Sequence, residues 1–492
     1  MSFQGNKKNV LKKDLFIDNG FIEGRRGVKR TFHSPQKCIE NPVIPCDKSW
    51  ENGAAFVDTG LVMYDEKEKM YRVWYQGGAC LGKDDHSTMC YAISTDGIHW
   101  KKPNLGIIKF EGSKENNILL YEDIMMHDPS VILDPEDTDA QKRYKAIWWG
   151  GRKAKGSEKE DILGHCVAFS ADGIRWQPHR DNPVWVGDAE VANLFGLEHK
   201  AGKFIASCSM DGHGMRVVAR TESNDFINWQ SPQLLLKSDE EDPPGTELGG
   251  LSAVNYYGIY IGMLWAIRRY PVPTRKRWNE IVDWGVKNHT FHPSIALNTG
   301  KAGKWTIHTQ LVFSRDGNTW QRVNRKPFMS VGTEGSWDEC LHLGARPLIT
   351  NDEIMFYYTG QGREENLPNE RPKPIRDWPQ ATGLATIRLD GFVSLDAIEE
   401  GVVVTKPFKW DGTNMAVNAD ASSGYIKAEV CTPQGEPISG YRQEEASLLT
   451  EDGLGQNLSW KKKADMSELR GRQIKLRFLL QKSSLFSISW LR

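Results

Sequence analysis

The sequence predicts an all-β fold, a five-bladed β-propeller followed by a C-terminal β-sandwich. Three observations predict it: a short turn motif recurs along most of the chain, strand-like segments precede every copy, and helical periodicity is nearly absent. The composition agrees, because 18 Trp, 46 Gly and 10% aromatic residues suit short strands joined by tight turns. With 492 residues, the chain is long enough for one large domain and a smaller one.

The turn motif has the pattern Ser-x-Asp-Gly-x-x-Trp. It occurs at 94–100, 170–176 and 314–320, returns at 223–229 with Phe in place of Gly, and has a degraded copy at 388–394. An Asp-Gly pair after a strand predicts a hairpin turn, since Gly adopts positive φ and the carboxylate accepts hydrogen bonds from the amides of the turn. The motif is therefore predicted to be structural, ending one strand and starting the outermost strand of a blade.

Each motif lies between the third and fourth strands of a predicted four-stranded unit. Besides the strand that runs directly into the motif, two more strand-like segments lie upstream of every copy. They fall at 61–64 and 71–75, 130–133 and 144–149, 193–197 and 204–207, 251–255 and 260–265, and 345–349 and 354–358. Five such units describe a five-bladed propeller.

After about residue 402 the repeat stops and a second all-β pattern begins. Alternating strands are predicted at 416–419, 425–430, 473–480 and 485–490. The expected domains are therefore a propeller over 1–402 and a β-sandwich over 403–492, whose role is to pack against the propeller. Two long insertions, 268–305 and 363–380, are expected to be lids, contacts in a homo-oligomer or disordered segments.

Charge and composition exclude several classes of protein. Lys and Arg total 63 against 64 Asp and Glu, a net charge of −1, so no field of one sign is available to recruit nucleic acid. No apolar run approaches the roughly 18–20 residues of a membrane span. Residues 1–17 lack the apolar core of a signal peptide, so a cytoplasmic protein is expected unless a leader has been removed. Eight scattered cysteines without a C-x-x-C pair favour reduced thiols over zinc or redox motifs.

Acidic side chains gather where the innermost strands are predicted to begin. These strands line the central channel of a propeller, so residues at their starts should converge. The carboxylates are Glu51 and Asp58 in blade one, Asp128 after His127 in blade two, Asp188 and Glu190 in blade three, Glu247 in blade four and Asp338 in blade five. Crowded carboxylates repel one another, so the set indicates catalysis or a bound cation. Each one alone is as readily explained as a cap that accepts hydrogen bonds from turn amides.

The five-bladed layout, an Asp-Pro at 128–129, an acidic residue entering blade three and a C-terminal β-sandwich resemble the propeller glycoside hydrolases of families 32, 43, 68 and 117. The resemblance implies that Asp58 is the base or nucleophile, that Asp128 stabilises the transition state and that Glu190 is the acid. Blade one lacks the Asn-Asp-Pro-Asn-Gly pattern of family 32, so Glu51 is an alternative to Asp58. Blade three lacks the Glu-Cys pair, so Asp188 is an alternative to Glu190.

Other residues are candidates for holding a carbohydrate substrate. Glu247 and Asp338 are predicted to bind sugar hydroxyls, with His342 and Arg346 as further candidates. His127 either orients Asp128 or caps the strand.

Tryptophans near the starts of blades one and five have two interpretations. Trp50 and Trp337 stack on a sugar ring or pack in the core under a turn. No metal or other cofactor is expected, because no spaced acidic loop marks a calcium site.

The leading hypothesis is an exo-acting glycoside hydrolase. Cleavage of a glycosidic bond needs one protonated carboxyl and one ionised carboxylate, which the channel would supply. A glycoside phosphorylase would need a phosphate site, for which the basic residues Arg268, Arg269, Arg275, Lys276 and Arg277 are candidates. A sialidase ranks lower, because the turn motif is one residue short of an Asp-box. The alternative from another class is a non-catalytic glycan-binding propeller.

Overall fold

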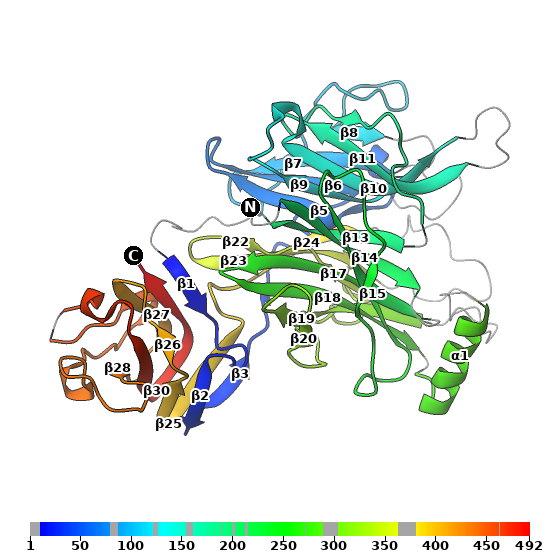
Figure 1. Cartoon of the computed structure of the whole chain (residues 1–492). Coiled ribbons are helices and arrows are strands. Elements are labelled where there is room, and N and C mark those ends of the chain that lie inside the picture. The colour runs from blue at the N-terminus through cyan, green and yellow to red at the C-terminus, as the bar shows by residue number, and fades with distance from the viewer. Residues whose placement is uncertain are drawn as a thin grey trace. The chain divides into compact units, whose positions relative to one another are not determined.

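The computed structural model describes residues 10–78, 87–121, 126–153, 161–187, 189–198, 202–211, 215–270, 272–288, 304–362, 380–461 and 463–492 (Figure 1). The chain divides into two compact units. The first takes in Lys37–Leu348 and Phe356–Ala385, and the second takes in Phe3–Gln36, Ile349–Met355 and Thr386–Arg492.

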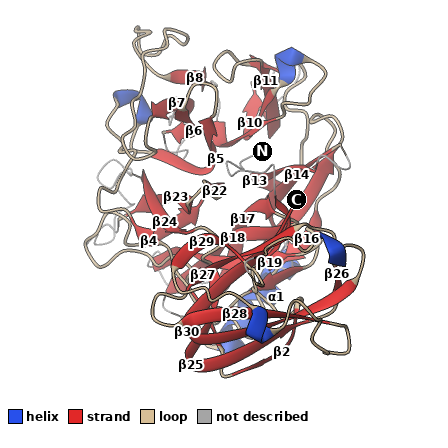
Figure 2. Ribbon diagram, turned by 90° about the vertical axis from the view of Figure 1, so that its left-hand side faces the viewer, coloured by secondary structure: helices blue, strands red, loops and turns tan. Residues whose placement is uncertain are grey.

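The first unit is the predicted five-bladed propeller. Figure 2 shows its blades arranged around one centre. Blades one to three are separate four-stranded sheets in which strands follow one another in chain order. Blade one is β5 (Ala55–Asp65), β6 (Met70–Gly77), β7 (Thr88–Ser94) and β8 (Ile118–Tyr121). Blade two is β9 (Met126–Leu133), β10 (Tyr144–Arg152), β11 (Ile162–Ser170) and β12 (Gln177–Pro178). Blade three is β13 (Ala189–Glu198), β14 (Lys203–Asp211), β15 (Arg216–Ser223) and β16 (Gln233–Leu236).

Blades four and five are joined in one sheet by a single parallel pair, Ile307 with Leu341. Blade four is β17 (Thr246–Tyr256), β18 (Ile259–Tyr270), β19 (Lys304–Ser314) and β20 (Trp320–Arg322). Blade five is β21 (Leu341–Gly344), β22 (Leu348–Ile349), β23 (Glu353–Gln361), β24 (Ala381–Arg388) and β4 (Gln36–Lys37).

The ring of blades is closed by a strand from the other end of the chain. The sequence pattern placed the outermost strand of blade five after the degraded motif at 388–394, and this was wrong. That position is taken by β4, which pairs with β24, and the neighbouring Cys38 N–H donates to Leu384 O (2.8 Å). The residues after the turn form β25 (Val393–Thr405) in the second unit instead. The pairing covers the outer edge of β24 with a strand from the N-terminal part of the chain.

The repeated turn is structural, as predicted, and its hydrogen bonds recur in all four full copies. In blade two the Ser170 hydroxyl accepts from Gly173 N–H (2.9 Å), and Asp172 Oδ1 accepts from the N–H groups of Ile174 and Arg175 (both 2.8 Å). The Trp176 indole N–H then donates to Gly173 O (2.9 Å).

Copies one, three and four repeat these bonds with their own residues. The third copy differs at the glycine position, where Phe226 adopts φ +67°. Its ring is fully buried in the core between blades two and three, so packing offsets the strain of a positive φ.

Replacing Asp172 with Ala is expected to lower the free energy of unfolding by about 1–3 kcal/mol, because two turn amides lose their acceptor. The midpoint of urea unfolding measures the change. Asp181→Ala is the control, since the Asp181 carboxylate is exposed and pairs with the exposed Arg180, and its backbone N–H bond to His179 does not depend on the side chain. Equal midpoints for the two variants would show that the turn does not depend on its carboxylate.

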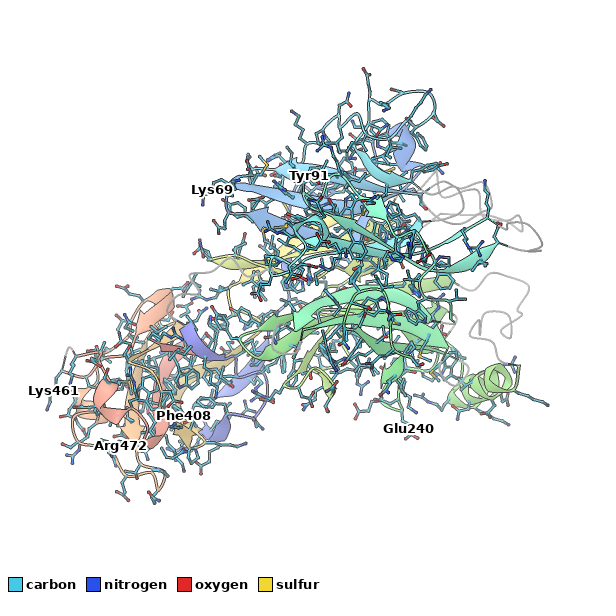
Figure 3. All side chains as sticks on the ribbon, turned by 45° about the horizontal axis from the view of Figure 1, so that its top comes forward. Lys69, Tyr91, Glu240, Phe408, Lys461 and Arg472 are labelled. Atoms are coloured by element: carbon cyan, nitrogen blue, oxygen red, sulfur yellow. The ribbon has the colours of Figure 1, made fainter. Side chains whose placement is uncertain are left out.

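The interior of the propeller is built from apolar side chains shared between adjacent blades. Trp74 is fully buried, packs against Tyr91 of its own blade and Tyr144 of blade two, and donates from its indole to Gly173 O (2.6 Å). Figure 3 shows Tyr91 among the side chains of blade one, whereas Lys69 lies at the turn between β5 and β6. Similar buried clusters fill the spaces between blades two and three and between blades three and four.

The second unit is a nine-stranded sheet assembled from both ends of the chain. Its strands are β1 (Val10–Asp14), β2 (Ile22–Arg26), β3 (Lys29–Phe32), β25, β26 (Phe408–Lys409), β27 (Asn414–Asp420), β28 (Tyr425–Cys431), β29 (Asp452–Asn457) and β30 (Gln473–Leu491). The long strand β30 pairs with β25 and β28 in its first half and with β27 and β1 in its second. The expected boundary at 402/403 lies inside β25, and the division of these strands into two facing sheets stays a prediction.

The insertion at 268–305 contains the α-helix α1 (Arg275–Asn288), which the sequence analysis did not predict. The helix begins after Thr274, whose hydroxyl accepts from Arg277 N–H (3.2 Å), and the side chain of Trp278 is buried. Among the described residues, no helix combines the length and apolar character needed to cross a bilayer. The remaining helical turns are 3₁₀: η1 (Ser49–Glu51), η2 (Ala140–Lys142), η4 (Gln443–Glu445) and η5 (Ser467–Leu469).

Candidate active site

The innermost strands of blades one, two and five are interrupted where they line the channel. In blade one the pairing jumps from Phe56–Gln76 to Leu61–Trp74, so residues 57–60 bulge out of the sheet. In blade two the register shifts between Ile147 and Trp149, which leaves residues 128–129 in a bulge. In blade five, β21 ends at Gly344 and β22 begins at Leu348. Bulges re-aim side chains away from the sheet and are frequent beside active sites.

Asp58 and Asp128 occupy the first two of these bulges and lie close enough to influence one another. The carboxyl of Asp58 is buried, with 3% of the residue exposed, and its Oδ1 accepts from Thr59 N–H (3.0 Å). Burial and the charge of Asp128 raise the pKa of Asp58 well above its ordinary value, against the opposing effect of the Thr59 hydrogen bond. The buried site therefore favours the protonated form of Asp58 more than water does.

The backbone of Asp128 has an unusual conformation and is fixed by a hydrogen bond. It adopts φ +52°, a strained conformation for a non-glycine residue, and its N–H donates to Gln76 Oε1 (2.8 Å). The following Pro129 accepts through its carbonyl from the Thr59 hydroxyl (3.4 Å), which joins the two bulges. The Asp128 side chain is 16% exposed, so it is more accessible than Asp58.

The first bulge also contacts blade five, because Asp58 N–H donates to the Thr359 hydroxyl (3.3 Å) of β23. Thr359 and Gln76 were not predicted from the sequence. Both lie on the second strand of a blade, and only the observed register shows that they reach the inner strand.

His127 precedes Asp128 as the sequence indicates, with Nδ1 3.4 Å from Asp128 Oδ2. Across the sheet it faces Trp149 of β10, which faces His165 of β11 in turn. The His165 ring is buried and stacks on Trp185 (4.2 Å between centroids, 18° between planes). Burial lowers the pKa of His165 to about 3, so this ring is neutral. Trp149 and His127 are both part-exposed, so an aromatic surface borders the carboxylate pair.

Arg346 occupies the interruption in blade five. It is half-buried, and it has no hydrogen-bond or ion-pair partner among the residues that the structure describes. Burial lowers the pKa of the guanidinium to about 10, which still leaves it charged at neutral pH.

A second group of predicted residues gathers around Tyr358 in blade five. Asp338 is buried and accepts from Lys37 Nζ (2.5 Å) and from the Tyr358 hydroxyl (3.1 Å). The Tyr358 ring stacks on His342 (3.7 Å) and on Trp337 (5.8 Å). His342 is fully buried, and burial and the nearby charge of Lys37 lower its pKa well below the ordinary value, so it is neutral. Asp338 is thus already engaged by protein donors, and its predicted sugar contact stays a prediction.

Glu51 is not brought to the carboxylate pair. It is fully buried, accepts from the Tyr75 hydroxyl (2.7 Å) and forms an ion pair with Lys102 (2.6 Å). Tyr75 and Gln76 are consecutive on β6, so their side chains lie on opposite faces, and Gln76 is the one that reaches Asp128. Of the two candidates in blade one, Asp58 is the neighbour of Asp128.

The remaining predicted residues are placed as follows. Glu247 is fully buried and accepts from Arg216 N–H (3.2 Å) of blade three. Trp50 is half-buried and donates to Asn117 Oδ1 (2.7 Å), which fits core packing. Glu190 lies on β13 opposite Ser209, but its side chain and the whole of Asp188 lie outside the described residues.

The basic residues proposed for a phosphate site do not form one described cluster. Arg275 donates to the carbonyls of Glu240 (3.1 Å) and Asp242 (2.5 Å), and Arg277 pairs with Glu280 (3.2 Å). Arg268 is half-buried on β18, and the side chain of Arg269 lies outside the described residues. Within the described part of the chain, no group of three or more His, Cys, Asp or Glu is arranged to hold a metal ion.

No protein-family model matches the chain, and no curated protein matches it in sequence. Several solved structures resemble it. A structure described as a glycoside hydrolase is 12% identical over 73% of this chain and 92% of its own, with a TM-score of 0.45. An N-acetylgalactosamine deacetylase from F. plautii, in complex with blood group B trisaccharide, is 14% identical over 75% and 97%, with a TM-score of 0.44. A structure of the GH130 family of mannoside phosphorylases, which contains glycoside hydrolases that target beta-1,2 mannosidic linkages in Candida mannan, is 14% identical over 72% and 94%, with a TM-score of 0.42.

Proposed function

We propose that the protein is a glycoside hydrolase whose proton transfers are carried by Asp58 and Asp128. The observation that supports this is the carboxylate pair: two acidic side chains on adjacent channel bulges, one buried with a raised pKa and one more exposed. Environments that separate the pKa values of two neighbouring carboxyls are what acid–base cleavage of a glycosidic bond requires.

In the proposed reaction Asp58 starts protonated and Asp128 ionised. The Asp58 proton moves to the glycosidic oxygen as the bond between that oxygen and the anomeric carbon breaks. Asp128 either attacks the anomeric carbon or takes a proton from the attacking water, and the two routes give retained or inverted configuration. The part-exposed rings of His127 and Trp149 offer a surface for stacking on the sugar. This assignment differs from the sequence resemblance, which implies that Glu190 is the acid, that Asp58 is the base or nucleophile and that Asp128 stabilises the transition state.

Exo-action is part of the proposal. Arg268 and Thr306, at the two ends of the long insertion, pair with each other, and Arg268 pairs with Thr246 at the start of the inner strand of blade four. The insertion therefore leaves the propeller at the end of the channel where inner strands begin, and a segment there would block one side of a long substrate.

Hydrolysis of aryl glycosides and plant or algal oligosaccharides is the direct test. Wild type should release a single sugar from one of them, and Asp128→Asn should lower the rate by about 10²-fold or more. Glu66→Gln is the control, because Glu66 is 67% exposed and pairs only with Lys69. Proton NMR of the first product reads whether configuration is retained or inverted. Binding of oligosaccharides with no cleavage in any variant would instead identify a glycan-binding propeller.

A further inference from the structure

The half-buried Arg346 has no anion beside it among the described residues. Arg322, by comparison, donates to both carboxylate oxygens of Asp242 (2.6 Å each), and Arg388 forms an ion pair with Asp452 (2.5 Å). Among the residues described, no donor–acceptor or ionic contact is made by Arg346. Removing a guanidinium from water without a counter-charge is unfavourable, so an unpaired one needs an explanation.

The position of Arg346 explains why its partner is absent from the protein. Ala345 N–H donates to Tyr357 O (2.9 Å), and the strand resumes at Leu348, so Arg346 lies in the gap between β21 and β22. This gap corresponds to the bulges that carry Asp58 and Asp128 on the inner strands of blades one and two. The Arg346 side chain is half-buried and lies at an interruption of an inner strand, so we expect it to face the channel.

Blade five is also in direct contact with the bulge of blade one. Thr359, which accepts from Asp58 N–H, pairs with Leu343 on β21, three residues before Arg346. An anionic group that entered the channel beside the carboxylate pair would therefore come within the neighbourhood of this guanidinium.

We infer that Arg346 is the anchor of an oxyanion subsite in the channel, and that the substrate brings the anion as a carboxylate or sulfate on the sugar. The planar guanidinium offers two parallel N–H donors, which match a carboxylate or sulfate in bidentate geometry. The identification of the anion as part of a substrate rests on the proposed function. The prediction that Arg346 binds a free anion does not depend on the proposed function.

Calorimetric titration of the whole protein tests the subsite. The probes are glucuronate, galacturonate, sulfate and inorganic phosphate, with glucose and galactose as neutral controls. At least one anion should bind with one site per chain, and Arg346→Gln should raise its Kd by about tenfold or more, because a charge-assisted bidentate contact is lost. The Kd of Arg346→Lys should fall between those of wild type and Arg346→Gln, since Lys keeps the positive charge but cannot make the bidentate contact. Arg180→Gln, which changes an arginine that is 89% exposed, should leave the Kd unchanged.

The probes also identify the source of the anion. Binding of a uronate or of sulfate in preference to phosphate supports an acidic glycan as substrate. Binding of phosphate, with a sugar phosphate formed when phosphate is added to a glycoside, supports the same subsite occupied by a free anion. The idea is overturned if no anion binds, or if binding survives in both Arg346 variants. Asp128→Asn separates this result from the proposed function, because it should stop hydrolysis and still bind the anion.

Discussion

Asp58→Asn should lose about 10²–10⁴-fold in hydrolysis rate and yet be more stable than wild type at neutral pH. The loss follows because Asn cannot deliver a proton to the leaving oxygen. The fold should survive, because the Asn side-chain oxygen can still accept from Thr59 N–H and the backbone bond to Thr359 is untouched. The gain in stability, about 0.5–2 kcal/mol, follows because burial and Asp128 make the wild-type carboxyl costly to ionise on folding, whereas Asn has no proton to take up.

The pKa shift of Asp58 also sets the direction in which the stability difference changes with pH. Burial and Asp128 raise the pKa of Asp58 in the folded protein above its ordinary value of 3.8. Between 3.8 and the raised value, the folded state binds more protons than the unfolded state, so the wild type loses stability as pH rises through this range. The Asp58→Asn variant lacks this titrating carboxyl, so it does not lose stability in this way. The difference in unfolding free energy should therefore be small near pH 3.8, grow as pH rises and level off above the folded pKa of Asp58.

Urea unfolding at a series of pH values and steady-state kinetics measure the two effects. Glu66→Gln serves again as the control, because it removes an exposed carboxylate with neither effect expected. A variant that keeps its activity would remove Asp58 from the proposed reaction. Full loss of activity without the pH-dependent gain in stability would mean that the two carboxylates do not interact in solution.

Asp390→Ala should destabilise the second unit by about 3–5 kcal/mol, because it leaves the buried ammonium of Lys13 without its counter-charge. Lys13 Nζ lies 2.9 and 2.8 Å from the two oxygens of Asp390, and both side chains are buried. The Ser487 hydroxyl also donates to Asp390 Oδ2 (2.5 Å). Hydrogen exchange of β30 and the midpoint of urea unfolding measure the effect.

A double variant separates lost charge from lost packing. Lys13→Met combined with Asp390→Leu removes both charges and keeps apolar volume, so it should recover most of the stability. Arg180→Gln is the control, because it breaks an exposed pair and should change the midpoint little. An Asp390→Ala protein that unfolds at the wild-type urea concentration would show that this buried pair is not coupled to the stability of the unit.

The parts of the fold that were predicted correctly are those encoded by local interactions. The turn motif satisfies its own amides within seven residues, as at Ser170 to Trp176, so its recurrence was enough to divide the chain into blades. Strand β4 and the N-terminal strands of the second unit could not be found this way. Their partners lie near the other end of the chain, and no local pattern records a pairing such as Asp14 with Ile488.

The helix α1 was missed for a different reason. Thr274 is a good N-cap, and Trp278, Ile281 and Val282 have helical spacing, but the segment lies inside a long insertion between strands, which was interpreted as a loop.

The candidate site was predicted in part. Asp58 and Asp128 were found because they lie at the starts of inner strands, where the repeat places the channel. Gln76 and Trp149 were not, because they reach the site from the second strand of a blade, and only the cross-strand register places them there. A side chain's neighbours across a sheet depend on bulges, and a bulge such as that at 57–60 has no clear sequence signal.

Because β4 closes the ring, the propeller cannot be completed until late in the synthesis of the chain. As the ribosome makes the chain, β1 to β4 emerge before almost all of the propeller, while β24, β25 and β30, with which they pair, follow much later. For most of synthesis these early strands have exposed edges and no partners, a state prone to wrong pairing with other chains. The nascent protein should therefore depend on chaperones most strongly before residues 381–491 have emerged, and a fragment cut at residue 403 should not fold by itself.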